Sequence, residues 1–274
     1  MRVRIGFIGD IVGKPGRKMI AHHLPSIRES ERLDFVIANA ENASHGFGTT
    51  IKCAEELFSA GVDILTGGNH TWDKREITTL LTQESPRVLR PHNYPLGVAG
   101  SGVGIREVRA QKLAVLNLMG HFAMPYVDNA FLCAQNSVRE LRESGIGHIV
   151  VDFHAEATSE KRGMFWLLAG NVSAVLGTHT HVGTDDLEIS EGTLGVSDVG
   201  ASGCMDGIIG MDRHAPLERF LTGMPAKLEI PSQCRSILQM IILELDNEGR
   251  CVEAYKIRAV DNLAPCKTIE AFIY

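Results

Sequence analysis

The stretch Val62-Asp63-Ile64-Leu65-Thr66-Gly67-Gly68-Asn69-His70-Thr71-Trp72-Asp73 decides how the rest of this chain is interpreted. Its apolar run, 62–66, is typical of a buried strand, and the two glycines that follow indicate a turn. Asn69 offers a neutral carbonyl oxygen to a metal ion, whereas His70, which faces another way, can carry a proton. Gly-Asn-His alone is a weak signal, but other predicted strand ends in the chain carry matching side chains.

The composition indicates a folded protein with a moderate negative charge. The chain has 274 residues, of which 44% are hydrophobic, so it can bury a sizeable core. Its formal net charge of -6 argues against stable binding to a nucleic-acid backbone, which requires a basic surface, but not against a small nucleotide substrate. The six cysteines form no Cys-x-x-Cys pair, which is typical of reduced thiols in a cytoplasmic protein. The first apolar run is too short for a signal peptide or a membrane span.

The first third of the chain predicts successive strand–helix units. The predicted elements are a strand at 3–8, a helix at 17–31, a strand at 35–38, a helix at 51–60 and a strand at 62–66. Gly13-Lys14-Pro15-Gly16 predicts a turn before the first helix, which we expect to bend or break near Pro25. Polar residues follow each strand, and open α/β sheets bind their ligands at the carboxyl ends of strands.

The rest of the chain predicts further elements without a long linker or an internal repeat. They are hairpins over 102–119, 187–197 and 236–260, helices at 128–144 and 159–169, and strands at 148–153 and 173–176. Thr158 or Ser159 is the expected N-cap of the second of these helices. We predict a single α/β domain, residues 1–274, with a layered sheet core. The last hairpin could close the monomer's own sheet or supply an edge for association.

Polar side chains that can bind metals gather at the predicted strand ends. They are Asp10, Glu41, Asn42, Asn69, His70, His154, His179 and His181. Seven of these eight can be metal ligands, and His179 and His181 are expected to share one face of an extended segment. A carboxylate that can bridge, together with oxygen and imidazole ligands, suits two first-row metal ions. In phosphoester hydrolases such a pair lies roughly 3.5–4 Å apart.

The order of these blocks resembles the calcineurin-like metallophosphoesterase superfamily. Its last three blocks stand here as Gly68-Asn69-His70, His154 and Gly177-Thr178-His179-Thr180-His181. Asp10 lacks the histidine that accompanies it in the superfamily, and Glu41-Asn42 replaces the bridging aspartate. These departures, and the segment 154–161, are similar to the bacterial YmdB-like phosphodiesterase subfamily over nearly the whole chain. The resemblance implies a four-layer α/β/β/α sandwich with a dinuclear metal site at strand ends.

The resemblance also implies a role for each residue. One metal ion would be held by Asp10, Glu41, Asn42 and His181, and the other by Glu41, Asn69, His154 and His179, so that Glu41 is the bridge. Iron or manganese is expected, with zinc as the alternative. A hydroxide that bridges the metals would attack a phosphodiester, with 2′,3′-cyclic nucleotides as the implied substrates, and His70 would be the general acid. The resemblance further implies a homo-oligomer.

Other functional classes are weighed against this one. A non-catalytic regulatory or nucleotide-sensing protein that keeps the metal site is the main alternative. A metal-dependent amide hydrolase is disfavoured, because such barrels place His-x-His at the first strand and here it comes late. Pro15 follows Gly13-Lys14 where a P-loop needs Ser or Thr, and no Gly-x-Gly-x-x-Gly fingerprint for dinucleotides is present. Phe47 and Trp72 are interpreted as packing groups.

Overall fold

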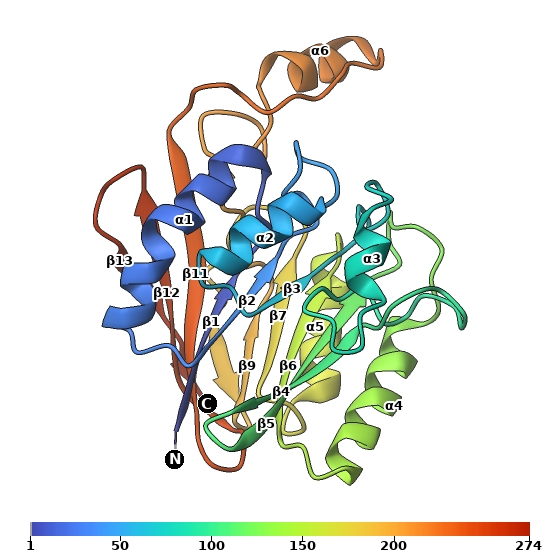
Figure 1. Ribbon diagram of the computed structural model, residues 1–274, viewed down its shortest axis with the longest axis vertical. Helices are drawn as coiled ribbons and strands as arrows, with labels where there is room; N and C mark the ends of the chain where they lie inside the picture. Colours follow the sequence, from blue (N-terminus) through green and yellow to red (C-terminus); the bar gives the residue numbers. More distant parts are fainter. Residues whose placement is uncertain (1) are drawn as a thin grey trace.

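Two β-sheets packed face to face, each covered by helices on its outer side, form the body of the molecule (Figure 1). The structure is a computed structural model that describes residues 2–274. The first sheet has the strand order β13-β12-β11-β1-β2-β3, with β10 beside β11. The second sheet has the order β14-β8-β9-β7-β6-β5-β4.

The bounds of these elements are as follows. The strands of the first sheet are β1 (Val3–Ile8), β2 (Phe35–Asn39), β3 (Ile64–Thr66), β10 (Gly203–Cys204), β11 (Ser236–Leu245), β12 (Cys251–Val260) and β13 (Cys266–Glu270). The strands of the second are β4 (Val103–Val108), β5 (Gln111–Met119), β6 (His148–His154), β7 (Ala174–Thr178), β8 (Glu188–Ser190), β9 (Thr193–Val196) and β14 (Phe272–Ile273). The helices are α1 (Gly13–Ser30), α2 (Ile51–Ser59), α3 (Ile77–Leu81), α4 (Ala130–Glu143), α5 (Thr158–Leu168) and α6 (His214–Thr222).

Three clusters of buried apolar residues fill the spaces between four layers. Along β1, Ile5 and Phe7 pack between the two sheets, whereas Ile8 packs with the layer of α1 and α2. In β5, Val115 packs between the sheets and Leu116 packs with the layer of α4 and α5. Successive side chains of a strand point to opposite faces, so both faces of each sheet are buried here. The predicted α/β/β/α sandwich is confirmed.

Parallel strands bring the predicted site residues to one edge of the molecule. β1, β2 and β3 run parallel in the first sheet, as do β5, β6 and β7 in the second. Two hydrogen bonds join these edges. Asn39 Nδ2, at the end of β2, donates to Asp152 Oδ2 of β6 at 2.9 Å, and Thr66 Oγ1, at the end of β3, donates to the same oxygen at 2.5 Å. The loops that follow both sets of strands therefore meet.

Several local predictions differ from the structure. α1 begins at Gly13, so the predicted turn over 13–16 is its first turn, where Pro15 breaks no helical hydrogen bond. The helix also continues through Pro25 to Ser30. α5 begins directly after Ala157, so neither Thr158 nor Ser159 is its N-cap. No prediction covers α3 and α6; α3 has only five residues, too few for an apolar period to stand out, and the exposed α6 buries only Pro216.

The predicted final hairpin lies inside the first sheet, where β11 pairs with β1 and β12 pairs with β13. It therefore closes the monomer's own sheet. Residues 205–235, which we call the lobe, leave this sheet between β10 and β11 and carry α6 beyond the strand ends (Figure 1). Among residues 2–274, no helix is long and apolar enough to cross a membrane.

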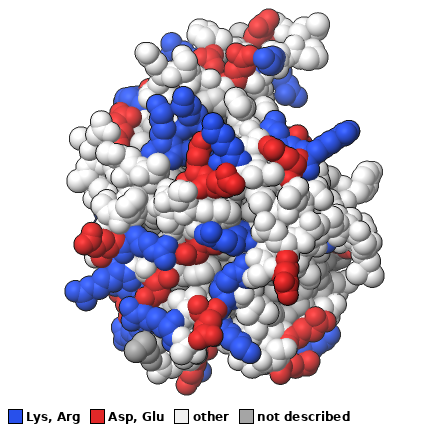
Figure 2. Space-filling model, in the orientation of Figure 1, with Lys and Arg blue, Asp and Glu red and all other residues white. Residues whose placement is uncertain are grey.

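Charged side chains of both signs are interspersed over the face shown in Figure 2. A surface hollow beside α1 and α2 combines Lys14, Arg17 and Lys52 with Glu55 and Glu56. Arg17 Nε lies 2.7 Å from Glu56 Oε2, so part of this positive charge is paired. On the face drawn, basic residues therefore form no unbroken surface of the kind that binds a nucleic-acid backbone.

Candidate metal centre

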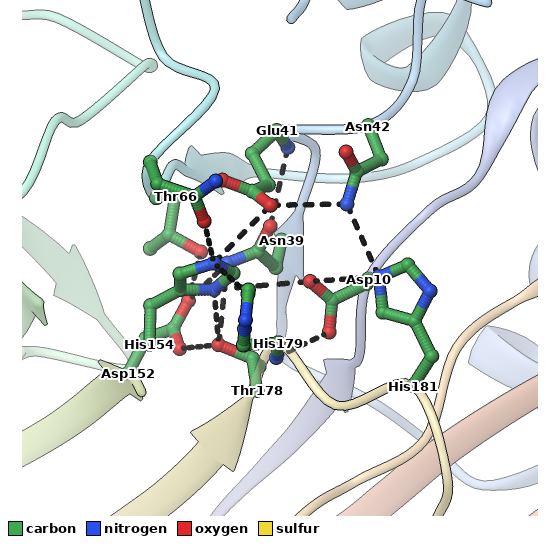
Figure 3. Close-up of polar contacts among 12 residues, drawn as sticks. Asp10, Asn39, Glu41, Asn42, Thr66, Asp152, His154, Thr178, His179 and His181 are labelled. Atoms are coloured by element: carbon green, nitrogen blue, oxygen red, sulfur yellow. Dashed lines mark hydrogen bonds and ion pairs between the residues drawn. The ribbon is translucent and has the colours of Figure 1, made fainter. Parts of the chain in front are cut away.

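Three polar atoms surround the Nε2 nitrogen of His154 at the edge where the sheets meet (Figure 3). Asn69 Oδ1 lies at 3.0 Å, Glu41 Oε1 at 3.1 Å and His179 Nδ1 at 3.1 Å. One imidazole nitrogen has a single hydrogen or a single lone pair, so it cannot bond to all three. Such spacing is expected of ligands around a shared cation, because neighbouring ligands with bonds of roughly 2.1 Å lie about 3 Å apart.

The remaining predicted ligands lie against this group. Asn42 Nδ2 donates to Glu41 Oε1 at 3.0 Å and lies 3.2 Å from His181 Nε2, which is itself 3.8 Å from Asp10 Oδ1. Asp10 Oδ1 is buried and has no hydrogen-bond partner among the residues described. A buried carboxylate oxygen without a partner is costly unless a cation lies beside it. The seven residues predicted as ligands thus form one cluster, and their oxygen and nitrogen atoms fit divalent metal ions.

A glycine allows this close approach. A Cβ atom on Gly68 would lie 2.2 Å from Glu41 Oε2 and 2.4 Å from His154 Nε2, which is far inside van der Waals contact. The backbone N–H of His70 donates to the same Glu41 oxygen at 3.0 Å. The Gly-Asn-His turn therefore orients Glu41 through its backbone as well as supplying Asn69.

A buried network that the sequence analysis missed orients His154. Its Nδ1 lies 2.9 Å from Thr178 Oγ1, and that hydroxyl donates to Asp152 Oδ1 at 2.8 Å. Because the Thr178 hydrogen is used on the carboxylate, its oxygen accepts from Nδ1–H of His154, which leaves the Nε2 lone pair facing the cluster. Thr66 and Asn39 donate to the other Asp152 oxygen. The signal for this network in the sequence is Asp152, a carboxylate among the apolar residues of the predicted strand at 148–153.

The electrostatics of the cluster favour positive charge. Burial raises the pKa of Glu41, but the charge and hydrogen bond of His154 outweigh it and lower this pKa to about 2. Burial lowers the pKa of His154, but the Glu41, Asp10 and Asp152 carboxylates outweigh it and raise this pKa to about 9. Burial and the His154 charge lower the pKa of His179 to about 4. The carboxylates thus favour a positive charge at Nε2 of His154, which either a second proton or a metal ion can supply.

His70 differs from the seven cluster residues. Its Nδ1 lies 2.8 Å from Asp73 Oδ2, and its ring meets that of Phe47 edge to face with centroids 5.0 Å apart. The side chain is partly exposed and lines a cavity that opens beside the cluster. Phe47 packs on His70 and also lines the same cavity, and Trp72 packs on Tyr94. His70 can therefore meet a ligand that the other residues hold.

The His-x-His segment is held in an unusual backbone conformation. His179 has φ 101° and His181 has φ 66°, values that non-glycine residues rarely adopt. Between them, Thr180 donates to Asp198 Oδ2 through its backbone N–H at 3.1 Å and through its hydroxyl at 2.7 Å. Lys161 Nζ donates to the same oxygen at 2.9 Å. These bonds fix the segment that presents both imidazoles.

The segment 154–161 surrounds the cluster on its α5 side. Glu156 Oε2 lies 2.9 Å from His179 Nε2, on the opposite side of that ring from His154. Glu160 accepts from the backbone N–H of His121 at 2.8 Å, and Lys161 bonds to Asp198. The charged side chains that make this segment recognisable thus hold the site in place.

A cavity of about 600 Å³ opens beside the cluster. One side is formed by cluster residues with His70 and Glu156, and the other by residues of the lobe. Arg219 is the one Lys or Arg among the described lining residues. A substrate in this cavity would meet the cluster and the lobe together.

The chain has clear relatives among bacterial proteins. A family model described as "YmdB-like protein" matches residues 7–257. The 2′,3′-cyclic-nucleotide 2′-phosphodiesterase of Bacillus subtilis (strain 168) is 40% identical over 259 residues, which cover 94% of this chain and 96% of the relative.

Solved structures are similar over almost the full length. A hypothetical protein from Thermus thermophilus has a TM-score of 0.85 and 39% identity, covering 98% of this chain and 100% of that chain. A protein described as a novel phosphatase, from Mycoplasma pneumoniae, has a TM-score of 0.88 and 31% identity, covering 95% of this chain and 94% of that chain. The likeness extends through both sheets and the lobe, since so little of the chain is left out.

Proposed function

Because this chain belongs to the YmdB-like protein family, we propose that it is a metal-dependent phosphodiesterase that hydrolyses 2′,3′-cyclic nucleotides. Its broader class follows from the family and its named relatives: it is a phosphoric ester hydrolase with a metallophosphoesterase fold. The finer proposal rests on one observation, the convergence of Glu41, Asn69, His154 and His179 at the side of a cavity.

Two metal ions would be held by the seven clustered residues. The proposed ligands of one ion are Asp10, Glu41, Asn42 and His181, and those of the other are Glu41, Asn69, His154 and His179. The contacts of Glu41 Oε1 with both Asn42 and His154 support its role as the bridge. Asn42 would present its Oδ1 once its amide is flipped end for end. An oxygen-rich set favours iron or manganese, with zinc as the alternative.

When bound, such ions supply an activated water and neutralise charge on the phosphoryl oxygens. The protein positions the reacting groups around them. Thr178 and Asp152 keep His154 in the tautomer that presents Nε2, and the backbone of His70 orients Glu41. The His70 side chain bonds to Asp73 through Nδ1, which leaves Nε2 as the nitrogen that carries a proton to the leaving oxygen.

Metal analysis of the purified protein, combined with a substrate screen, tests the proposal. The screen compares 2′,3′-cyclic AMP with linear phosphodiesters and phosphomonoesters. We expect two metal ions per chain and hydrolysis of the cyclic ester, both lost on chelation. A protein that holds metal and binds the nucleotide, but never hydrolyses it, would instead be a nucleotide sensor.

A further inference from the structure

The cavity beside the metal centre has two unlike walls. The wall formed by the cluster is polar and charged. The opposite wall, which we call the lobe wall, consists of Ile208, Ile209, Met211, Pro216, Phe220 and Leu228. α6, which carries Phe220, stands over the strand ends where the cluster lies (Figure 1). A phosphoryl group needs only the polar wall, so the lobe wall is free to contact another part of the ligand.

Direct contacts hold the lobe wall in a fixed position beside the metal cluster. His181 Nδ1 lies 2.8 Å from the carbonyl oxygen of Ile209, so the lobe directly contacts a proposed ligand. Ile209 has φ 46°, which is rare for a β-branched residue. A Cβ atom on Gly46 would lie 2.6 Å from Met211 Cε, so the loop after β2 also packs closely on the lobe. These contacts set the distance between the two walls.

The chemistry of the lobe wall matches a flat organic group. Phe220 and Ile209 are exposed, at 74% and 52%, so their apolar surface faces water until something covers it. Small-molecule sites are cavities of roughly 300–1,000 Å³ with mainly apolar walls and a few polar groups that set orientation, and the cavity of about 600 Å³ is of this kind. Phe47 adds a second aromatic ring from a different element.

We propose that the lobe wall is a subsite for the base of a nucleotide whose phosphodiester lies at the cluster, an inference that rests on the proposed function. Aromatic and aliphatic side chains bind any base through its flat face, so the subsite favours cyclic nucleotides over small phosphodiesters without selecting one base.

The guanidinium of Arg219 makes no hydrogen bond or ion pair with any described residue. Its positive charge therefore attracts the anionic ester, whatever organic group that ester carries.

Two substrates distinguish an effect on the proposed base subsite from an effect on the metal centre. 2′,3′-Cyclic AMP and glycerol 1,2-cyclic phosphate share the five-membered cyclic ester, but only the first carries a base. For Phe220→Ala and Leu228→Ala we expect KM to rise about 10-fold on cyclic AMP and to stay within about 2-fold on the glycerol ester. Leu221→Ala is the matched control, because Leu221 is 85% exposed, follows Phe220 in α6 and does not line the cavity. Equal changes in KM on both substrates, or no change in KM on 2′,3′-cyclic AMP, would overturn the proposal of a base subsite.

Arg219→Gln is expected to raise KM on both esters and to make KM less dependent on salt concentration. Arg213→Gln is the control, because Arg213 lies on the lobe but does not line the cavity, and it should change neither property. If the wild-type protein hydrolyses neither ester, the proposed function fails, and the subsite is then tested by binding alone. Calorimetric titration of the metal-loaded protein with adenosine 3′-monophosphate and with inorganic phosphate would then show whether Phe220→Ala weakens only the nucleotide. Equal affinities in wild type and variant would reject the subsite.

Discussion

Lys161 Nζ lies 2.9 Å from Asp198 Oδ2, and both side chains are buried. A buried ion pair is weak evidence for stability, because the loss of hydration offsets the attraction of the charges. This pair has a third partner, Thr180, which lies between the two imidazoles of the His-x-His segment. We therefore interpret it as a clamp that holds His179 and His181 with positive φ.

Lys161→Met should weaken metal binding without touching a ligand. The change leaves Asp198 buried without its cation, so we expect a loss of roughly 3–5 kcal/mol in the free energy of unfolding. Metal affinity should fall about 10–100-fold, the usual cost of losing an outer partner of a metal site. Arg162→Met is the matched control, because Arg162 is the next residue of α5 and pairs with Glu188 instead. Unchanged metal affinity in Lys161→Met, measured by competition with a chelator, would refute the clamp.

Glu41→Gln should release both metal ions, since the bridge serves both, while the change keeps the size of the side chain. His181→Ala should release about one, because His181 contacts only the Asp10 and Asn42 side of the cluster. Metal analysis of the two variants separates these cases. Two ions retained in Glu41→Gln would show that another group bridges them.

Gly68→Ala should empty the centre although it removes no donor atom. The new methyl group would lie 2.2 Å from Glu41 Oε2 and 2.4 Å from His154 Nε2, so one of these ligands must move. Gly163→Ala in α5 is the control, since the nearest atom to its Cβ is Phe131 Cε1 at 3.3 Å. Metal content and thermal unfolding of both variants test this expectation, and full metal content in Gly68→Ala would contradict it.

His70→Ala should keep both metal ions, because the backbone N–H that orients Glu41 remains and Asn69 is untouched. If His70 is the general acid, the rate should fall roughly 10²–10⁴-fold on a cyclic nucleotide, whose leaving alkoxide needs a proton. A nitrophenyl diester, whose leaving oxygen is stable without one, should lose far less. Similar losses on both substrates with full metal content would indicate that His70 positions the substrate.

Lys256 should make stability rise with pH in alkaline solution. Burial lowers its pKa from 10.5 to about 8, and its Nζ lies 3.2 Å from the carbonyl oxygen of Thr184. Between pH 8 and 10.5 the unfolded chain therefore binds more protons at this residue than the folded chain, so deprotonation favours folding. The stability of the wild type relative to Lys256→Met should increase by on the order of 3 kcal/mol across that window. Denaturant titrations of both proteins at several pH values measure the difference, and a constant difference would contradict it.

The amino-acid sequence by itself determined the α/β class, most of the strands and helices, and the kinds of side chain at the strand ends, whereas the four-layer arrangement was implied by the family resemblance. Alternating or continuous apolar runs mark strands because each strand buries one or both faces, and Asp10, Asn69 and His154 each come within three residues of the end of such a run. The positions of the hairpins were also predictable, since a turn and its two flanking strands are adjacent in the chain. That residues 1–274 form one domain, and that the chain forms a homo-oligomer, stay predictions.

Only the tertiary structure decided which side chains outside the predicted ligand set meet. Asp152 contacts Thr66 because two sheets pack at one edge, and Thr180 contacts Asp198 because β7 and the loop after β9 lie together. The lobe wall likewise joins Phe220 to a cavity formed by loops far away in the chain. Such contacts depend on how layers pack, and local apolar periodicity carries no information about the distance between residues that are remote in sequence.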